Sequence, residues 1–366
     1  MASSGNTSQF RCPGCSADME FDPQSGGLKC RFCGHTEAVV PAATGVSVHT
    51  LEEGLAEAGS MAQKPHGDGA LEVTCNGCGS VVAFQPPQVA GVCPFCGGAI
   101  VAQPKTPDPL IAPDGVLPAK VPQAQAQMRV RQWLSARWFA PNALKRMAQQ
   151  EGIAGVYLPF WDWAADTESR YTGERGEHYW ETEYYTETEN GNTVQRERQV
   201  QRTRWYPAAG RVARRFDNVL VAATRSVHEA RLDALQPWDL ESLSAYEPAY
   251  LAGFRAQRYQ VELPEGFEKA KQAMAKVIDG DVRRDIGGDE QRVLGVDTTT
   301  SNATFRHLLL PVWIGAYRFK GKLYQVVVNA RTGEVQGERP WSVVKVSLLV
   351  AAILLVIVVL VMIGHR

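Results

Sequence analysis

The longest apolar run of the chain lies at its C-terminal end. From Val346 to Ile363 every residue except Ser347 is apolar, and a helix needs roughly 20 such residues to cross the hydrocarbon core of a bilayer. A buried core helix can also be apolar on every side, but only three residues follow the run, so little protein remains to cover it. The pattern predicts a transmembrane helix over residues 343–363.

The residues beside this run favour one orientation in the membrane. Trp341 lies where an aromatic side chain anchors at the interface, and Arg339 and Lys345 supply positive charge on the same side. The first ten residues, MASSGNTSQF, lack the basic start and apolar stretch of a secretory signal. We therefore expect a single-pass protein whose N-terminus and bulk are cytoplasmic.

Helical and strand periods alternate in the central part of the chain. Pro122 suits the first turn of a helix, and apolar residues recur at helical spacing until Pro141. Further helices are predicted over residues 50–61, 142–150 and 265–278. Strand-like sequence follows, in which Leu158–Trp161 (LPFW) is repeated as Leu310–Trp313 (LPVW). Because each copy follows a helix, the order indicates a helix-then-meander unit used twice.

A long hairpin is the most regular local feature. The acidic and aromatic run HYWETEYYTETE meets the basic run TVQRERQVQRTRW across Asn190-Gly191, a strong two-residue turn signal. Pairing Glu189 with Asn192 sets a register that places Glu183 opposite Arg198. Both faces of this ribbon are largely polar, so we expect it to project into solvent.

All eight cysteines fall in the first hundred residues, as four Cys-x-x-Cys pairs. They are Cys12, Cys15, Cys30, Cys33, Cys75, Cys78, Cys93 and Cys96. The second four repeat the first at an offset of 63 residues, and Phe21 and Gly34 recur at that offset as Phe84 and Gly97. Two such quartets are typical of structural zinc ribbons in a reducing compartment.

Metal at these sites is expected to be structural. Four thiolates leave no open coordination position for water or substrate, so Zn²⁺ in either site would not be a hydrolytic centre. Iron is the alternative, because four-thiolate sites of similar spacing occur in rubredoxin-like electron carriers. His35 and His66 are possible substitute ligands, but the complete sets of cysteines favour solvent-exposed positions for both.

These patterns predict an α+β protein with six parts. They are a zinc ribbon over residues 10–40, a linker over 41–70, a second zinc ribbon over 71–102, a Pro-rich linker over 103–122, an α+β domain with antiparallel strands and the long hairpin over 123–340, and the transmembrane helix. The prolines of residues 103–122 exclude a regular helix there and favour an extended, semi-rigid spacer.

The charge distribution argues against nucleic acid as the ligand. The formal net charge is -1, whereas phosphate binding needs clustered Lys and Arg. No Lys or Arg lies between Ala70 and Ala102, and the first ribbon offers only Arg11, Lys29 and Arg31. The Arg-rich strand of the hairpin could bind phosphate, but pairing with its Glu-rich neighbour is the favoured interpretation.

Signals for catalysis are weak. Asp162, Asp166 and Glu168 could act as paired carboxylates, although acids on strands and turns are usually solvated. The histidines show no H-E-x-x-H spacing, and Gly321-Lys322 lacks the other residues of a phosphate loop. The sequence therefore predicts neither an enzyme nor a small-molecule substrate.

Four parts of the chain resemble a known family. They are the paired cysteine quartets, SARWFAPNALKRMAQQEGIAGVYLPFWDWAADTESRYTGERGEHY, DVRRDIGGDEQR and LLLPVWIGAYRFKGKLYQVVVNARTGEVQGERP. They are similar to bacterial membrane-anchored proteins with paired TFIIB-type zinc ribbons, often labelled as related to primosomal protein N-prime (replication factor Y). The chain lacks the helicase motifs that this label suggests.

Some members of this family are similar to zinc-ribbon anchors encoded beside a phage-shock-protein A-type membrane-stress protein and an SPFH or virion-core-like protein. The resemblance implies an adaptor that holds such cytosolic proteins at the bacterial inner membrane, and only the eight cysteines carry over as functional residues. A nucleic-acid-binding accessory of replication and a rubredoxin-like redox carrier are the alternatives.

Overall fold

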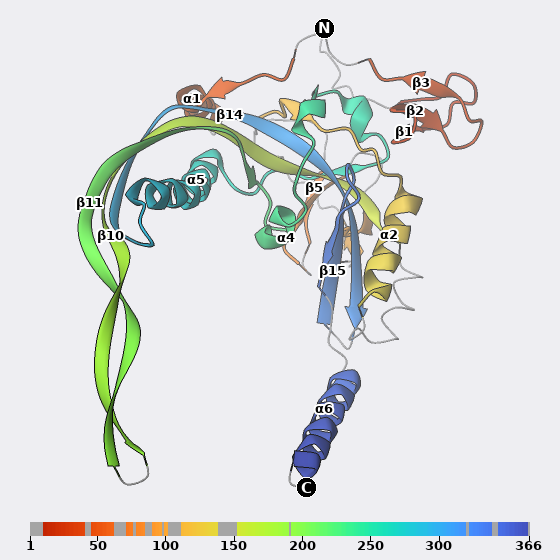
Figure 1. Cartoon of the computed structure of the whole chain (residues 1–366). Helices are drawn as coiled ribbons and strands as arrows, with labels where there is room; N and C mark the ends of the chain where they lie inside the picture. The colour runs from red at the N-terminus through yellow and green to blue at the C-terminus, as the bar shows by residue number, and fades with distance from the viewer. Residues whose placement is uncertain are drawn as a thin grey trace.

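The computed structural model describes most of the chain. The described residues are 10–40, 45–61, 71–75, 78–84, 90–96, 99–101, 111–137, 152–189, 192–319, 322–338 and 343–364. They form two small cysteine modules and a central domain built on an antiparallel sheet (Figure 1). The predicted α+β class is confirmed to this extent.

Three very long strands dominate the central sheet. The sheet follows the order β11-β10-β14-β15-β16, and neighbouring strands are antiparallel. The five strands of this order are β10 (Ala154–Glu189), β11 (Asn192–Ala222), β14 (Glu290–Phe319), β15 (Lys322–Asn329) and β16 (Val335–Gly337), of which the first three are the long ones. The short strands β4 (His49–Thr50), β9 (Gly115–Val116), β12 (Ser244–Ala245) and β13 (Arg255–Ala256) join it at the sides. Residues 155–163 of β10 are all buried because elements cover both of their faces.

Helix α5 (Leu263–Ile286) lies inside the curve of the long strands (Figure 1). One stripe of the helix is buried against them, and Ala270, Met274 and Ile278 belong to it. The prediction of residues 265–278 was too short, because Val282 and Ile286 continue the stripe. The helix ends where Gly287 adopts a φ of 64°.

Apart from α6, described below, the remaining helices of the described residues are short. They are α1 (Leu51–Met61), α2 (Gln123–Ser135), α4 (Glu229–Asp233) and the 3₁₀ turns η1 (Leu240–Ser242) and η2 (Pro248–Leu251). The helices predicted over residues 50–61 and after Pro122 are confirmed by α1 and α2. The helix predicted over residues 142–150 lies outside the described residues.

The contacts of the two LPxW strands support the internal duplication. Leu158 of β10 lies opposite Leu310 of β14, so the repeated segments cross at equivalent positions. In each segment the tryptophan makes an equivalent hydrogen bond to the other copy of the repeat. The Trp161 indole donates to the Val261 carbonyl, and the Trp313 indole donates to the Val121 carbonyl, both at 2.8 Å. Each carbonyl lies immediately before a helix of the opposite copy.

The Pro-rich segment is not a solvent-exposed spacer in its second half. Val116, Leu117 and Ala119 are at most 1% exposed, and β9 pairs with both β12 and β14. The segment is extended, as its prolines predict, but its backbone donates to Leu309 and Ala330 of the central domain. Residues 102–110 lie outside the described part.

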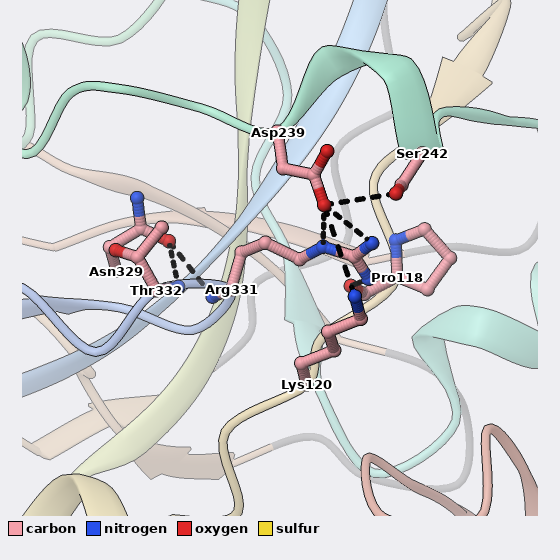
Figure 2. A network of polar contacts seen from close by, with 7 residues as sticks. All are labelled: Pro118, Lys120, Asp239, Ser242, Asn329, Arg331 and Thr332. Carbon is pink, nitrogen blue, oxygen red and sulfur yellow. Dashed lines mark hydrogen bonds and ion pairs between the residues drawn. The ribbon is translucent and has the colours of Figure 1, made fainter.

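A buried arginine fixes this segment to the turn between β15 and β16. Arg331 donates to Asp239 at 2.8 and 2.9 Å and to the Pro118 carbonyl at 3.1 Å (Figure 2). The Arg331 guanidinium lowers the pKa of Asp239. The Asn329 side chain accepts the backbone N–H groups of Arg331 and Thr332, which holds the turn in place. All of these partners are residues of the central domain and of the Pro-rich segment, so the network stabilises the fold.

The hairpin of β10 and β11 has the predicted register. Glu189 pairs with Asn192, and Glu183 lies opposite Arg198. Pairing with β14 ends at Gly176, so the outer part of the hairpin extends away from the rest of the described structure (Figure 1). Its arginines contact acids of the neighbouring strand; Arg198 donates to Glu183 at 2.7 Å. Its turn, Asn190-Gly191, lies outside the described residues.

Helix α6 (Val343–Gly364) stands apart from the other elements (Figure 1). No helix among the described residues is long and apolar enough to cross a membrane. The side chains at positions 343, 344, 346 and 359 of α6 are outside the described set. The described side chains from Ser347 onward are exposed, including Leu355 at 66% and Ile363 at 66%.

His307 is a fully buried titratable group in the central domain. Its Nδ1–H donates to the Ile111 carbonyl at 3.0 Å, and its ring centroid lies 4.9 Å from that of Trp161. Burial lowers the pKa of His307 below its ordinary value of 6.5. The unfolded chain therefore takes up a proton near that value while the folded chain does not, and stability falls as the pH drops below it.

Replacing His307 should flatten this pH dependence. The His307→Asn variant retains an N–H donor near the Nδ1 position for Ile111 but cannot titrate. Between about pH 7.5 and pH 5.5, the slope of its free energy of unfolding against pH should be smaller than that of the wild type by up to about 1.4 kcal/mol per pH unit. Urea unfolding of both proteins across this range measures the two slopes. Parallel slopes would show that His307 does not contribute.

Candidate metal centres

The first cysteine module is a three-stranded ribbon. Its strands are β1 (Met19–Asp22), β2 (Gly27–Cys30) and β3 (Thr36–Ala38). Each Cys-x-x-Cys pair forms a tight turn closed by a backbone hydrogen bond, from Ser16 N to Cys12 O at 2.8 Å and from Gly34 N to Cys30 O at 3.1 Å. Ser16 and Gly34 both adopt a positive φ, so the residue after each pair makes the sharp turn.

The four sulfurs of this module form one group. Cys12, Cys15, Cys30 and Cys33 place their Sγ atoms within 4.8 Å of one another, with 3.3 Å between Cys12 and Cys33 and 3.5 Å between Cys15 and Cys30. A tetrahedral ion with bonds of about 2.3 Å separates its sulfurs by about 3.8 Å. All four thiols are free of disulfides. The donor set therefore fits a tetrahedral metal ion.

Backbone N–H groups of the second turn point at one of these sulfurs. The N–H groups of Cys33 and Phe32 lower the pKa of Cys30 to about 6. Donors placed in this way favour the thiolate, which is the form that binds metal. The fold of the turn thus favours the metal-binding form of this one ligand.

The second module repeats the first. Its strands are β5 (Leu71–Thr74), β6 (Val81–Phe84), β7 (Ala90–Val92) and β8 (Ala99–Val101). The pairs Ala90↔Val101 and Gly27↔Ala38 occupy the same positions in the two copies. Its sulfurs form a second group of four, with 3.5 Å between Cys75 and Cys96 and 3.6 Å between Cys78 and Cys93. All eight predicted ligands are therefore assembled as two sites that could hold a metal ion.

The two modules differ in their surroundings. In the first, Cys15 and Cys33 are exposed. In the second, Cys75, Cys93 and Cys96 are at most 3% exposed and belong to an apolar cluster of the central domain. Burial raises the pKa of Cys93, whereas its counterpart Cys30 has a lowered pKa. The second module is part of the core, and the first is attached to the surface.

The sheet of the first module and two of its cysteines, Cys12 and Cys30, lie against the central domain. Phe21 N donates to the Ala252 carbonyl at 2.9 Å, and the Phe21 ring packs edge-on against Tyr250 with centroids 5.4 Å apart. Met19 and Leu28 are buried in one apolar cluster with Ala249. Cys15 and Cys33 are left on the side that faces solvent.

The carboxylates considered for catalysis do not form a common site. Asp162 is 2% exposed and pairs with Arg306, and burial raises its pKa. Asp166 accepts from Asn302 at 2.9 Å, and Glu168 pairs with Arg211. Each acid has a separate partner, and Arg306 contacts only the Oδ2 atom of Asp162. His35 is exposed, as expected, and His66 and Gly321 lie outside the described residues.

Two features of the sites were not predicted from the sequence. The sharp turn after the first cysteine pair of each module is made by Ser16 and by its counterpart Gly79, which both adopt a positive φ. The burial of the second module was also missed, although the sequence contains a signal for it. The absence of Lys and Arg between Ala70 and Ala102 excludes phosphate binding, and it equally suits a segment packed into a core.

Comparisons with known proteins add a relative but no function. No protein-family model matches the chain, and no solved structure matches it. The chain is 27% identical over 341 residues to an uncharacterized protein of Bacillus subtilis, YdjG, and the match covers 92% of each protein. A functional assignment therefore depends on the sites and surfaces described above.

Proposed function

We propose that this protein is a membrane-anchored zinc-binding adaptor that docks cytosolic proteins at the inner membrane of a bacterium. The observation that carries the proposal is the solvent-facing first module, whose complete set of four thiolates leaves no position for a substrate. A closed metal site on a surface is suited to holding a binding loop rigid, not to catalysis. Zinc is the proposed ion because it favours tetrahedral sulfur sites and needs no redox partner.

Helix α6 is the proposed anchor, on the strength of the apolar run Val346–Ile363 in the sequence, since the described residues alone contain no helix long and apolar enough to cross a membrane. Its described side chains from Leu348 to Ile363 are apolar and exposed, including Leu354 at 57% and Ile357 at 49%, and a helix that is apolar all round is stable only when protein or lipid covers it. Lys345, Arg339 and Trp341 suit the cytoplasmic interface. The sites would then face the cytoplasm, where partners of the phage-shock-protein A or SPFH type implied by the resemblance reside.

Nucleic acid is a poorer candidate for the ligand. The arginines of the hairpin are engaged with acids of the same ribbon: Arg196 with Glu187, and Arg202 with Glu181 and Glu183. Arginines already paired in this way have less charge to offer phosphates, and the second module, which lacks Lys and Arg, is buried.

Disrupting α6 should release the protein and its partners from the membrane. The variant Leu354→Arg with Ile357→Arg places two charges in the middle of the proposed span, each costing about 2.5 to 3.5 kcal/mol there. The wild type should stay in carbonate-washed membranes with a reproducible set of bound proteins, whereas this variant should be soluble. Leu354→Val with Ile357→Val is the matched control and should behave as the wild type.

Two outcomes would contradict the proposal. An arginine variant that stays in the washed membranes would show that α6 is not the anchor. A wild-type protein that brings no cytosolic protein with it would remove the adaptor function.

A further inference from the structure

The duplication places one phenylalanine in two different surroundings. Phe32 lies between the cysteines of the turn Cys30–Cys33, and Phe95 has the same position in Cys93–Cys96. Phe32 is 82% exposed, whereas Phe95 is 1% exposed. The local chain is equivalent in both turns, so the difference arises from what lies against each.

The central domain shows what kind of surface this turn fits. Phe95 is part of an apolar cluster that includes Leu158, Leu235 and Trp238. The Gln325 Nε2 atom donates to the Phe95 carbonyl at 2.7 Å. The receptor for one copy of the turn is therefore an aliphatic and aromatic pocket with a side-chain amide at its rim.

The first copy presents the same shape to solvent. A turn closed by backbone hydrogen bonds and held by four sulfurs is rigid, so little conformational entropy would be lost when Phe32 is buried. Rigid aromatic side chains dominate the binding energy of protein interfaces. Two of the three basic residues of this module are paired, Arg31 with Glu20 and Arg11 with Asp18, so little unpaired positive charge is offered to a phosphate ligand.

We propose that residues 30–34 form a docking knob that inserts Phe32 into an apolar pocket of a cytosolic protein. The partner supplies aliphatic and aromatic side chains around the ring and an N–H donor to the Phe32 carbonyl, as the central domain does for Phe95. The first module lies at the opposite end of the structure from α6 (Figure 1), so a soluble protein, rather than lipid, is the occupant. This inference rests on the proposed adaptor function and names the surface that performs it.

A photo-crosslinking amino acid at the knob identifies the partner. The full-length chain, with p-benzoylphenylalanine in place of Phe32, is irradiated in living cells and the attached protein is identified and purified. Its affinity is then measured for the full-length wild type, for Phe32→Ala and for Val40→Ala. Val40 is 79% exposed in the same module and is the matched control. We expect Phe32→Ala to weaken binding about tenfold or more, and Val40→Ala to change it by less than about twofold.

Two further measurements make the result decisive. Phe32→Ala must keep the metal content and unfolding midpoint of the wild type, because an exposed side chain contributes little to the fold. The attachment site on the partner must lie in an apolar pocket. The inference is overturned if Phe32→Ala binds as tightly as the wild type, or if the crosslink forms only with lipid, with nucleic acid or with no molecule.

The failure of this inference differs from the failure of the adaptor function. If wild-type and Phe32→Ala proteins carry the same partners from membranes with equal affinity, docking occurs through another surface, and only the knob is refuted. If the wild type carries no partner, the adaptor function itself is refuted.

Discussion

The Cys96→Ser variant should lose about 4 kcal/mol or more of its free energy of unfolding. Cys96 is 3% exposed within the apolar cluster that contains Leu158 and Trp238. Removing its thiolate breaks a four-sulfur site, so the free energy of metal binding is lost from the folded state, and a buried hydroxyl replaces the sulfur. A loss of this size is a large part of the total stability of a typical domain.

Cys33→Ser is the matched control, because Cys33 has the same position in the first copy. Cys33 is exposed, so its loss should disturb the first module while the central domain loses less than about 2 kcal/mol. Urea unfolding followed by tryptophan fluorescence reports on the central domain, where Trp161 and Trp163 are fully buried. Equal destabilisation by the two variants would refute the difference in role between the modules.

Local signals in the sequence were sufficient for the elements that depend on neighbours in the chain. The hairpin register follows from the Asn-Gly turn and from the complementary charges of its strands, and the structure confirms Glu183 opposite Arg198. The cysteine spacing likewise predicts both groups of sulfurs. Interactions between residues close in sequence determine these features, so composition and spacing are enough to find them.

Tertiary contacts decide what the sequence did not reveal. Phe32 and Phe95 lie in matching motifs, and only the packing of Leu235, Trp238 and Gln325 around the second copy separates them. The prolines of the extended segment before α2 exclude a helix and predict a spacer, yet Leu117 in this segment is 0% exposed. An extended segment can lie in solvent or in a core, and its backbone preference is the same in both.

If the duplicated module serves the fold in one copy and the surface in the other, metal ions bound at the two sites should differ in their access to solvent. Cys15 and Cys33 are exposed, whereas three of the four cysteines of the second site are buried. A chelator should therefore reach the first ion directly and the second only after the core opens. Loss of the second ion should accompany unfolding, because its ligands are part of the core.

Staged metal removal from the full-length protein in detergent tests this division most directly. Zinc bound per chain is measured by native mass spectrometry during exposure to EDTA, and tryptophan fluorescence is recorded in parallel. The expected result is two zinc ions at the start, rapid loss of one with unchanged fluorescence, and loss of the other only together with the unfolding signal. Simultaneous release of both ions, or a protein purified with iron or without metal, would contradict the account.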